Sequence, residues 1–293
     1  MNAVKNRELP IVFGAYEQLV GILRRPRPQQ QDYETAVILL TAGMMHSSGP
    51  FRLHVDLARA LGNTGLYSLR FDLSGIGESL AIGSTGTSLE RAASEVSSAI
   101  DYLQEHYGLK RFGLFGLCSG ADDALYAATQ DDRIGAVFSL DGLGYPTTRF
   151  YFHRFMQHYL PKLLSARKTW QLSRRLLGLE RPAPESLQQG DDIREFPAKP
   201  EALRQIQQLL QRGVHMHFHY TGGVDYYSYP TQFYDMFPSL RAMASARNAG
   251  RITHSFNPAS DHVGFLCEHR ADIVARVCRH QMEFAESQEG VCK

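Results

Sequence analysis

The hydrophobic positions of the chain form short apolar runs that alternate with longer stretches of helical periodicity. Short runs bounded by polar turns are typical of buried strands, and apolar residues spaced three and four apart predict amphipathic helices. Eight strands are expected, at Ile11–Phe13, Gln18–Leu23, Ala36–Thr41, Leu66–Phe71, Arg111–Leu117, Ile134–Leu140, Val214–Tyr220 and Arg251–Phe256. The alternation predicts an α/β protein with a mostly parallel eight-stranded sheet flanked by helices.

Two of the expected helices carry start signals. Pro50 is expected to open a helix that runs through Leu61, because proline is favoured in a first helical turn. Thr87 and Glu90 have the spacing of a capping box, in which each side chain bonds the other residue's backbone N–H. A second helix is therefore predicted to begin after Thr87.

The alternation stops in the middle of the chain. Tyr145–Leu179 has a helical and strongly aromatic pattern, whereas Glu180–Pro200 is polar and proline-rich and is expected to be a loop. We therefore predict a core made of residues 1–144 and 213–293, with a helical cap insertion of residues 145–212.

Composition excludes several classes of protein. The net charge of the 293 residues is +1, so no strong field points to nucleic acid or to a membrane surface. No apolar run is long enough to span a membrane, and the first residues lack the apolar region of a secretion signal. The four cysteines lack CxxC spacing, which favours reduced thiols in a cytoplasmic protein. The chain carries no P-loop lysine, GxGxxG motif or zinc spacing, so neither a cofactor nor a metal is expected.

Candidate chemistry lies in the turn that follows the Arg111–Leu117 strand. Gly116 and Gly120 flank Cys118 in the sequence GLCSG, the arrangement that presents a nucleophile at a sharp strand-to-helix turn. The following helix would place its positive end at the sulfur, which favours a thiolate. Ser119 is expected to donate its backbone N–H to an oxyanion. The alternative is a glycine-rich turn with a small buried cysteine.

A nucleophile of this kind needs a base and an orienting acid. His262 lies in a loop after the last expected strand, where it can return to the turn. Asp225 and Asp141 each follow a strand, and both loops should emerge at the same edge of a parallel sheet. Asp225 is the preferred acid and Asp141 the alternative, whereas Asp261 is expected to stabilise the loop of its neighbour His262.

Several segments resemble the α/β-hydrolases, and more narrowly the serine-aminopeptidase-like branch that includes monoacylglycerol lipases and acyl esterases. They are Leu69–Ser79 (LRFDLSGIGES), Gly116–Gly120 and Asp261–Phe265 (DHVGF). The segment Gln18–Pro26 and the aromatic, basic cap are similar to hydrolases associated with exosortase A systems, which often carry a cysteine at the elbow. The resemblance implies an α/β-hydrolase fold.

Carried over to this chain, the resemblance implies Cys118 as nucleophile, His262 as base and Asp225 as acid. The loop after the Ala36 strand would supply the second oxyanion N–H from Met44 or Met45. Cysteine in place of serine at the elbow is a departure from the family pattern. It favours a covalent thioester intermediate, which is more reactive toward amines and thiols than an ester.

The expected function is therefore cleavage of an acyl ester or thioester through acyl-Cys118. One alternative is an acyltransferase that passes the acyl group to an amine, hydroxyl or thiol, and another is a catalytically silent binding protein with the same fold. Oligomeric state cannot be derived from the sequence.

The cap and the loop after Tyr220 supply the candidate substrate contacts. Tyr145–Leu179 contains seven Lys or Arg and no Asp or Glu, so a basic rim could attract an acyl group carried on coenzyme A or on an acyl carrier protein. Arg174 and Arg175 would belong to this rim; outward-facing solvated charges are the alternative. The side chains expected to line the acyl pocket are Phe152, Phe155, Tyr226 and Tyr227, although both tyrosines would also suit a solvent-side loop.

Overall fold

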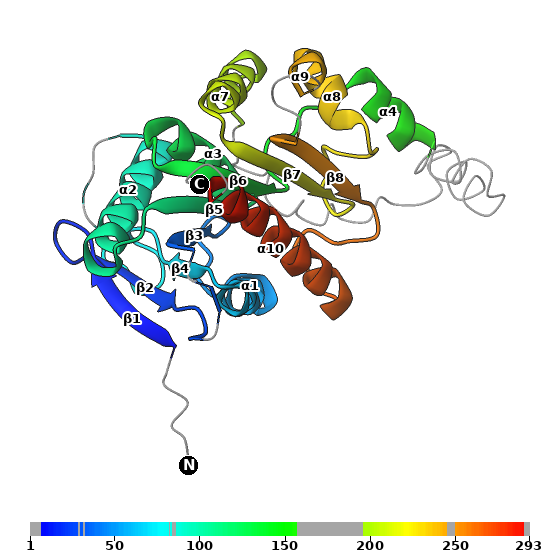
Figure 1. Cartoon of the computed structure of the whole chain (residues 1–293). Coiled ribbons are helices and arrows are strands. Elements are labelled where there is room, and N and C mark those ends of the chain that lie inside the picture. Colours follow the sequence, from blue (N-terminus) through cyan, green and yellow to red (C-terminus); the bar gives the residue numbers. More distant parts are fainter. Residues whose placement is uncertain are drawn as a thin grey trace.

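Eight strands form the centre of the computed structural model, which describes residues 7–28, 30–31, 33–81, 83, 86–156, 196–244 and 250–289. The strands are β1 (Glu8–Phe13), β2 (Leu19–Arg24), β3 (Thr35–Leu40), β4 (Tyr67–Phe71), β5 (Arg111–Leu117), β6 (Ile134–Leu140), β7 (His215–Thr221) and β8 (Ile252–Asn257). They lie in the order β1-β2-β4-β3-β5-β6-β7-β8 in one sheet (Figure 1). β2 runs antiparallel to β1 and β4, and every pair from β4 to β8 is parallel. The predicted fold class is thereby confirmed.

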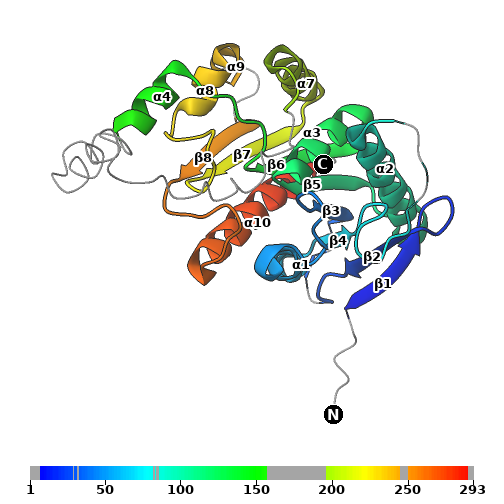
Figure 2. The same cartoon turned by 180° about the vertical axis from the view of Figure 1, so that it is seen from behind.

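Helices cover both faces of this sheet, as Figures 1 and 2 show from opposite sides. One face carries α2 (Ser88–Tyr107), α3 (Ser119–Gln130) and α7 (Lys199–Arg212), and the other carries α1 (Leu53–Thr64) and α10 (Cys267–Glu289). Because strand side chains alternate between faces, a strand covered on both sides is apolar throughout. All six residues of β3 are buried, which accounts for its uninterrupted apolar sequence.

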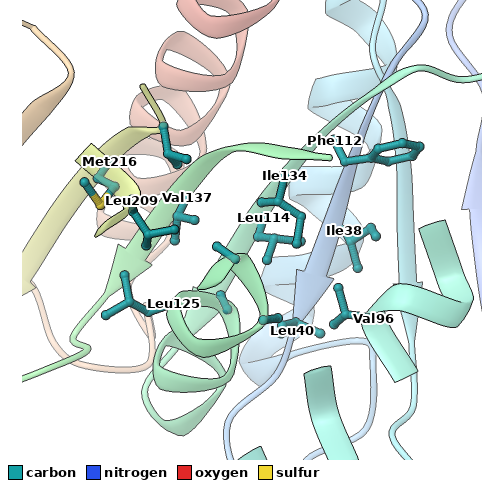
Figure 3. Packing of buried hydrophobic residues seen from close by; sticks show 14 of the residues in the cluster. Ile38, Leu40, Val96, Phe112, Leu114, Leu125, Ile134, Val137, Leu209 and Met216 are labelled. Atoms are coloured by element: carbon teal, nitrogen blue, oxygen red, sulfur yellow. The ribbon is translucent and has the colours of Figure 1, made fainter. Parts of the chain in front are cut away.

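The two faces bury separate hydrophobic clusters. Ile38 and Leu40 point to the α2 and α3 side, whereas their neighbours Val37 and Leu39 belong to the cluster beneath α1 and α10. Figure 3 shows the first cluster, in which Leu125 of α3 and other helical side chains pack against the strands. The labelled members are Ile38, Leu40, Val96, Phe112, Leu114, Leu125, Ile134, Val137, Leu209 and Met216.

The helix signals of the sequence have clear structural counterparts. Pro50 opens a short 3₁₀ turn, η1 (Pro50–Arg52), that leads into α1. Thr87 caps α2 by accepting a hydrogen bond from the Glu90 N–H, and the reciprocal bond completes the capping box. The Thr87 start is therefore confirmed, whereas α1 begins at Leu53, after the Pro50 turn and the left-handed Arg52.

The expected cap insertion is described only at its two ends. α4 (Thr148–Arg154) follows β6, and residues 157–195 lie outside the described part of the chain. α7 falls inside the range predicted for the cap, yet its buried residues pack with the sheet and α3 as a crossover helix. Two short helices, α8 (Gln232–Met236) and α9 (Pro238–Ala244), follow β7.

The parallel strands end at a common edge of the sheet. The register pairs Leu117 with Leu140 at the ends of β5 and β6, and the last residue of β6 pairs with His219 near the end of β7. Cys118 and Asp141 come directly after two of these strands. Ligand sites of open α/β sheets lie at this edge, so the candidate chemistry is assembled where the topology favours it.

Candidate active site

Cys118 occupies a sharp turn between β5 and α3. Its backbone has φ 56° and ψ −122°, a conformation that is rare for a residue with a side chain. Two backbone hydrogen bonds hold the turn, because Cys118 N–H donates to Leu140 O at 2.8 Å and Cys118 O accepts from Ala121 N–H at 2.9 Å. The predicted nucleophile thus lies in a strained strand-to-helix turn and not in a regular strand.

The two flanking glycines are required by close backbone contacts. A Cβ at Gly116 would lie 2.1 Å from Gly120 O, and a Cβ at Gly120 would lie 2.4 Å from Thr41 O. These neighbours are backbone atoms, which cannot rotate away. The GxCxG pattern therefore results from the close approach of β5, α3 and the end of β3.

His262 makes a hydrogen bond with a buried carboxylate. Its Nδ1 lies 2.8 Å from Oδ2 of Asp141, whose side chain is fully buried. The same carboxylate accepts two further hydrogen bonds from Thr221, one from the backbone N–H and one from the hydroxyl, each at 2.7 Å. These donors stabilise a negative charge that burial alone would disfavour.

His262 also makes a hydrogen bond with Cys118, which brings the predicted nucleophile and base together. Burial acts to lower the pKa of His262, but hydrogen bonds and charge interactions with Asp141 and Cys118 outweigh burial and raise that pKa to about 10. These interactions favour the protonated form of the imidazole. The loop that carries it is held by Asp261, whose carboxylate accepts from the N–H groups of Val263 and Phe265, as the sequence predicted.

The preferred acid of the sequence analysis does not contact His262. The Asp225 side chain is 95% exposed and lies 3.6 Å from Arg154, so the geometry corrects the preference for Asp225 and brings its alternative, Asp141, to the histidine. The chain turns away after Thr221, because Gly223 passes beneath the His262 loop so closely that a Cβ there would lie 2.5 Å from His262 N. Asp225 follows Gly223 in the chain, and its side chain lies in solvent away from His262.

The loop after β3 approaches the elbow through Gly43, a residue that was not predicted. Gly43 N–H donates to the Ser119 side-chain oxygen at 2.6 Å. Met45 N–H instead donates to Ala42 O within a turn, and the Met44 side chain is 92% exposed. Of the two residues expected to supply the second oxyanion N–H, Met45 thus has its N–H bonded within the loop, and a role for the Met44 N–H stays a prediction. A glycine three residues after the end of β3 was the available signal, since Gly43 has a positive φ of 50°.

The four predicted substrate contacts have different environments. Tyr227 is buried and stacks on Tyr220 with ring centroids 3.8 Å apart. The Tyr226 hydroxyl donates to Asp141 O at 2.7 Å, which makes it part of the support around the acid. Phe152 and Phe155 lie in or just after α4 and are largely exposed.

A cavity of about 460 Å³ lies beside the His262 loop. Its lining includes Gly223, Asp225, Tyr227 and Arg154, but neither Cys118 nor His262 is among the described residues that line it. Of the four residues expected to line the acyl pocket, only Tyr227 is among the described residues that line this cavity.

Two further features concern the cysteines and the lengths of the helices. Among the described residues, Cys118, Cys267 and Cys278 form no disulfide. No helix among the residues described here combines the length and apolar character that crossing a membrane requires.

Comparisons with known proteins identify the fold. No family model and no curated protein matches the chain. Among solved structures, an esterase of Pyrococcus furiosus is 12% identical and has a TM-score of 0.60 over 95% of this chain and 91% of that one. A lidless serine hydrolase of Xanthomonas campestris is 13% identical, with a TM-score of 0.55 over 95% of each chain. A dienelactone hydrolase of Anabaena variabilis is 15% identical, with a TM-score of 0.53 over 95% of this chain and 99% of that one. The chain has the α/β-hydrolase fold.

Proposed function

We propose that the protein hydrolyses acyl esters or thioesters through a covalent acyl-Cys118 intermediate. The observation that carries the proposal is the hydrogen-bonded series Cys118–His262–Asp141 at the strand ends. Nucleophile, histidine and oriented acid in contact are the elements of a catalytic triad. Esterases and hydrolases among the solved structures of this fold support the same reaction class.

The proposed site places an imidazole with a raised pKa beside the Cys118 sulfur. A protonated imidazole beside sulfur stabilises the thiolate over the thiol, and the thiolate is the reactive form. The start of α3 adds the positive end of a helix at the same sulfur. We propose that Cys118 attacks as the thiolate, so that His262 acts first as an acid toward the leaving group.

The proposed reaction has two halves. The Cys118 thiolate attacks the acyl carbon, a C–S bond forms, and the carbonyl electrons move to oxygen. Collapse of this intermediate expels the leaving group, which takes a proton from His262, and a thioester remains. His262, now neutral, removes a proton from water as the water attacks the thioester, and the carboxylic acid leaves as the thiolate is restored.

Asp141 has an orienting role in this scheme. Its hydrogen bond to Nδ1 fixes the tautomer of His262 and leaves Nε2 for the sulfur and the leaving group. The Thr221 donors and burial keep the carboxylate in one position. The acid thus stabilises the imidazolium without itself taking a proton.

The proposed substrates include acyl groups carried on coenzyme A or on an acyl carrier protein. Of the seven cationic residues in Tyr145–Leu179, Arg149 and Arg154 are described, and each lies within 4 Å of a carboxylate. These two arginines therefore already have carboxylate neighbours within the chain. Arg174 and Arg175, at which charge reversal was expected to weaken turnover of carrier-linked acyl groups, lie outside the described residues.

Intact-mass measurement tests the proposed intermediate. Wild type, Cys118→Ala and Cys267→Ala are each exposed to a panel of acyl thioesters and p-nitrophenyl esters. Cys267 is an exposed free thiol and serves as the matched control. We expect the mass of one acyl group on wild type and Cys267→Ala and none on Cys118→Ala. Product analysis with an added amine then distinguishes hydrolysis from acyl transfer, and equal labelling of all three proteins would refute acylation at Cys118.

A further inference from the structure

The Ser119 hydroxyl joins the elbow to the loop after β3. Its oxygen accepts a 2.6 Å hydrogen bond from Gly43 N–H, although the two residues are 76 positions apart in the chain. Ser119 is also the first residue of α3, so its backbone N–H belongs to the helix turn that has no intrahelical acceptor. Both polar groups of Ser119 thus lie next to the proposed nucleophile.

The donors that this loop offers to an oxyanion are largely occupied. Gly43 N–H is bonded to Ser119, and Met45 N–H is bonded to Ala42 O at 3.1 Å. A serine hydroxyl that accepts one hydrogen bond still has its own hydrogen to donate. The Ser119 hydroxyl can therefore supply a donor in place of these two occupied N–H groups.

We propose that the Ser119 hydroxyl donates a hydrogen bond to the oxyanion formed when Cys118 attacks, beside the Ser119 backbone N–H. This inference rests on the proposed function. Gly43 N–H strengthens this donor, because it donates to the Ser119 oxygen and a hydroxyl that accepts a hydrogen bond becomes a stronger donor itself. Ser119 is then a catalytic residue through its side chain as well as its backbone.

The supporting loop is held in place before any substrate binds. The Thr41 hydroxyl donates to Met45 O at 2.8 Å, and Ser47 N–H donates to the buried Asp72 carboxylate at 2.5 Å. Donors fixed in this way stabilise developing charge without reorganisation during the reaction. Gly43 therefore directs the Ser119 hydroxyl and leaves its hydrogen free for the oxyanion.

The test compares Ser119→Ala with Ser119→Thr and with Ser98→Ala. Ser98 lies on α2, and its hydroxyl donates within the helix, so this control removes a serine hydrogen bond far from the elbow. We expect Ser119→Ala to slow acylation about 100-fold, the lower end of what one oxyanion donor contributes, with KM changed only a few-fold. Ser119→Thr keeps the hydroxyl and should recover most of the rate, and Ser98→Ala should match wild type.

A thionoester, in which sulfur replaces the carbonyl oxygen, separates the two possible roles of Ser119. If Ser119 only supported the loop, Ser119→Ala would slow the oxoester and the thionoester equally. Sulfur anions accept hydrogen bonds poorly, so the rate ratio of an oxoester to its thionoester should fall in Ser119→Ala. Unchanged or faster acylation by Ser119→Ala would overturn the inference, and so would an equal loss on both substrates. If wild type is not acylated by any substrate of the panel, the proposed function fails and this inference fails with it; the other adverse outcomes leave the proposed function intact.

Discussion

Asp141 is positioned by the residues that donate to it. Its backbone φ of 49° turns the chain directly after β6, and aspartate tolerates this left-handed region better than most residues. The turn points the carboxylate at β7, where Thr221 supplies two donors, and at His262, which supplies the third. A buried charge with three hydrogen bonds is stable, whereas one that lost its partners would be costly.

Exchanging the two candidate acids for their amides tests which of them orients His262. In Asp141→Asn, the amide cannot reproduce the carboxylate that stabilises the imidazolium, so acylation should fall by about 10³- to 10⁴-fold. Asp225→Asn changes a solvent-exposed carboxylate and should acylate at the wild-type rate. Acyl-enzyme formation under single-turnover conditions gives the rates, and thermal unfolding checks that both variants fold. A large loss in Asp225→Asn with normal Asp141→Asn would contradict the assignment.

The sequence predicted the nucleophile and base but left the acid open, for a physical reason. Asp141 and Asp225 both follow strands that end at the same edge, so strand order alone cannot separate them. The choice depends on the path of the chain after Thr221 and on the crossing of Gly223 beneath the His262 loop. Such contacts between distant segments leave no local pattern. The Gly43–Ser119 bond escaped prediction in the same way.

At the scale of elements, the elbow depends on the absence of side chains at its glycines. In Gly120→Ala, the new Cβ would lie 2.4 Å from Thr41 O and 2.7 Å from Leu40 O, which forces α3 away from β3. We expect a loss of about 1–3 kcal/mol in the free energy of unfolding, the usual range for overpacking. Urea unfolding measures it.

Gly83→Ala is the matched control for that substitution. A Cβ at Gly83 would meet nothing within 4 Å, so the variant should unfold like wild type. If Gly120→Ala proved as stable as Gly83→Ala, the close packing of the elbow against β3 would be wrong. The comparison isolates contact with the backbone from the general effect of replacing glycine.

Elements with dense apolar runs were predictable and sparsely apolar ones were not. The predicted bounds of β5 and β6 match the structure, because both strands are covered on two faces and are apolar almost throughout. α10 was not among the expected elements. It packs on the sheet through buried side chains that include Ile273 and Val277, but polar residues interrupt these along its 23 residues, so the helix has no continuous apolar run.

On the scale of the whole molecule, four histidines gather on the face of the sheet beneath α1 and α10, three of them buried and His217 half-buried. Burial lowers the pKa of His54 to about 3, of His217 to about 2, of His219 to about 4 and of His280 to about 3. Rings of this group contact Phe115 or Phe138 of the central strands. Neutral imidazole is therefore part of the core on this side.

The buried histidines and His262 affect stability in opposite pH ranges. A histidine whose pKa is lowered by folding contributes fully above its unfolded value of about 6.5, and this contribution is lost as pH falls toward the folded value. His262 has a pKa raised to about 10, so its contribution is complete below about pH 6.5 and is lost as pH rises toward 10. Both contributions are present together near pH 6.5, where these groups place the stability maximum.

His54→Leu measures the acid side of this balance for one residue. His54 is fully buried, and its ring nitrogens have no hydrogen-bond partner among the described residues, so leucine removes a proton-binding site without breaking a hydrogen bond. One such histidine costs the folded state about 2 kcal/mol between pH 6.5 and pH 5, since each pH unit corresponds to about 1.4 kcal/mol. Between pH 7 and pH 5, the free energy of unfolding should therefore fall less in His54→Leu than in wild type, by about that amount. Urea unfolding at the two pH values measures the difference. The same substitution at exposed His106 should leave the wild-type loss unchanged, and an identical pH response in all three proteins would mean that His54 takes up a proton in the folded state.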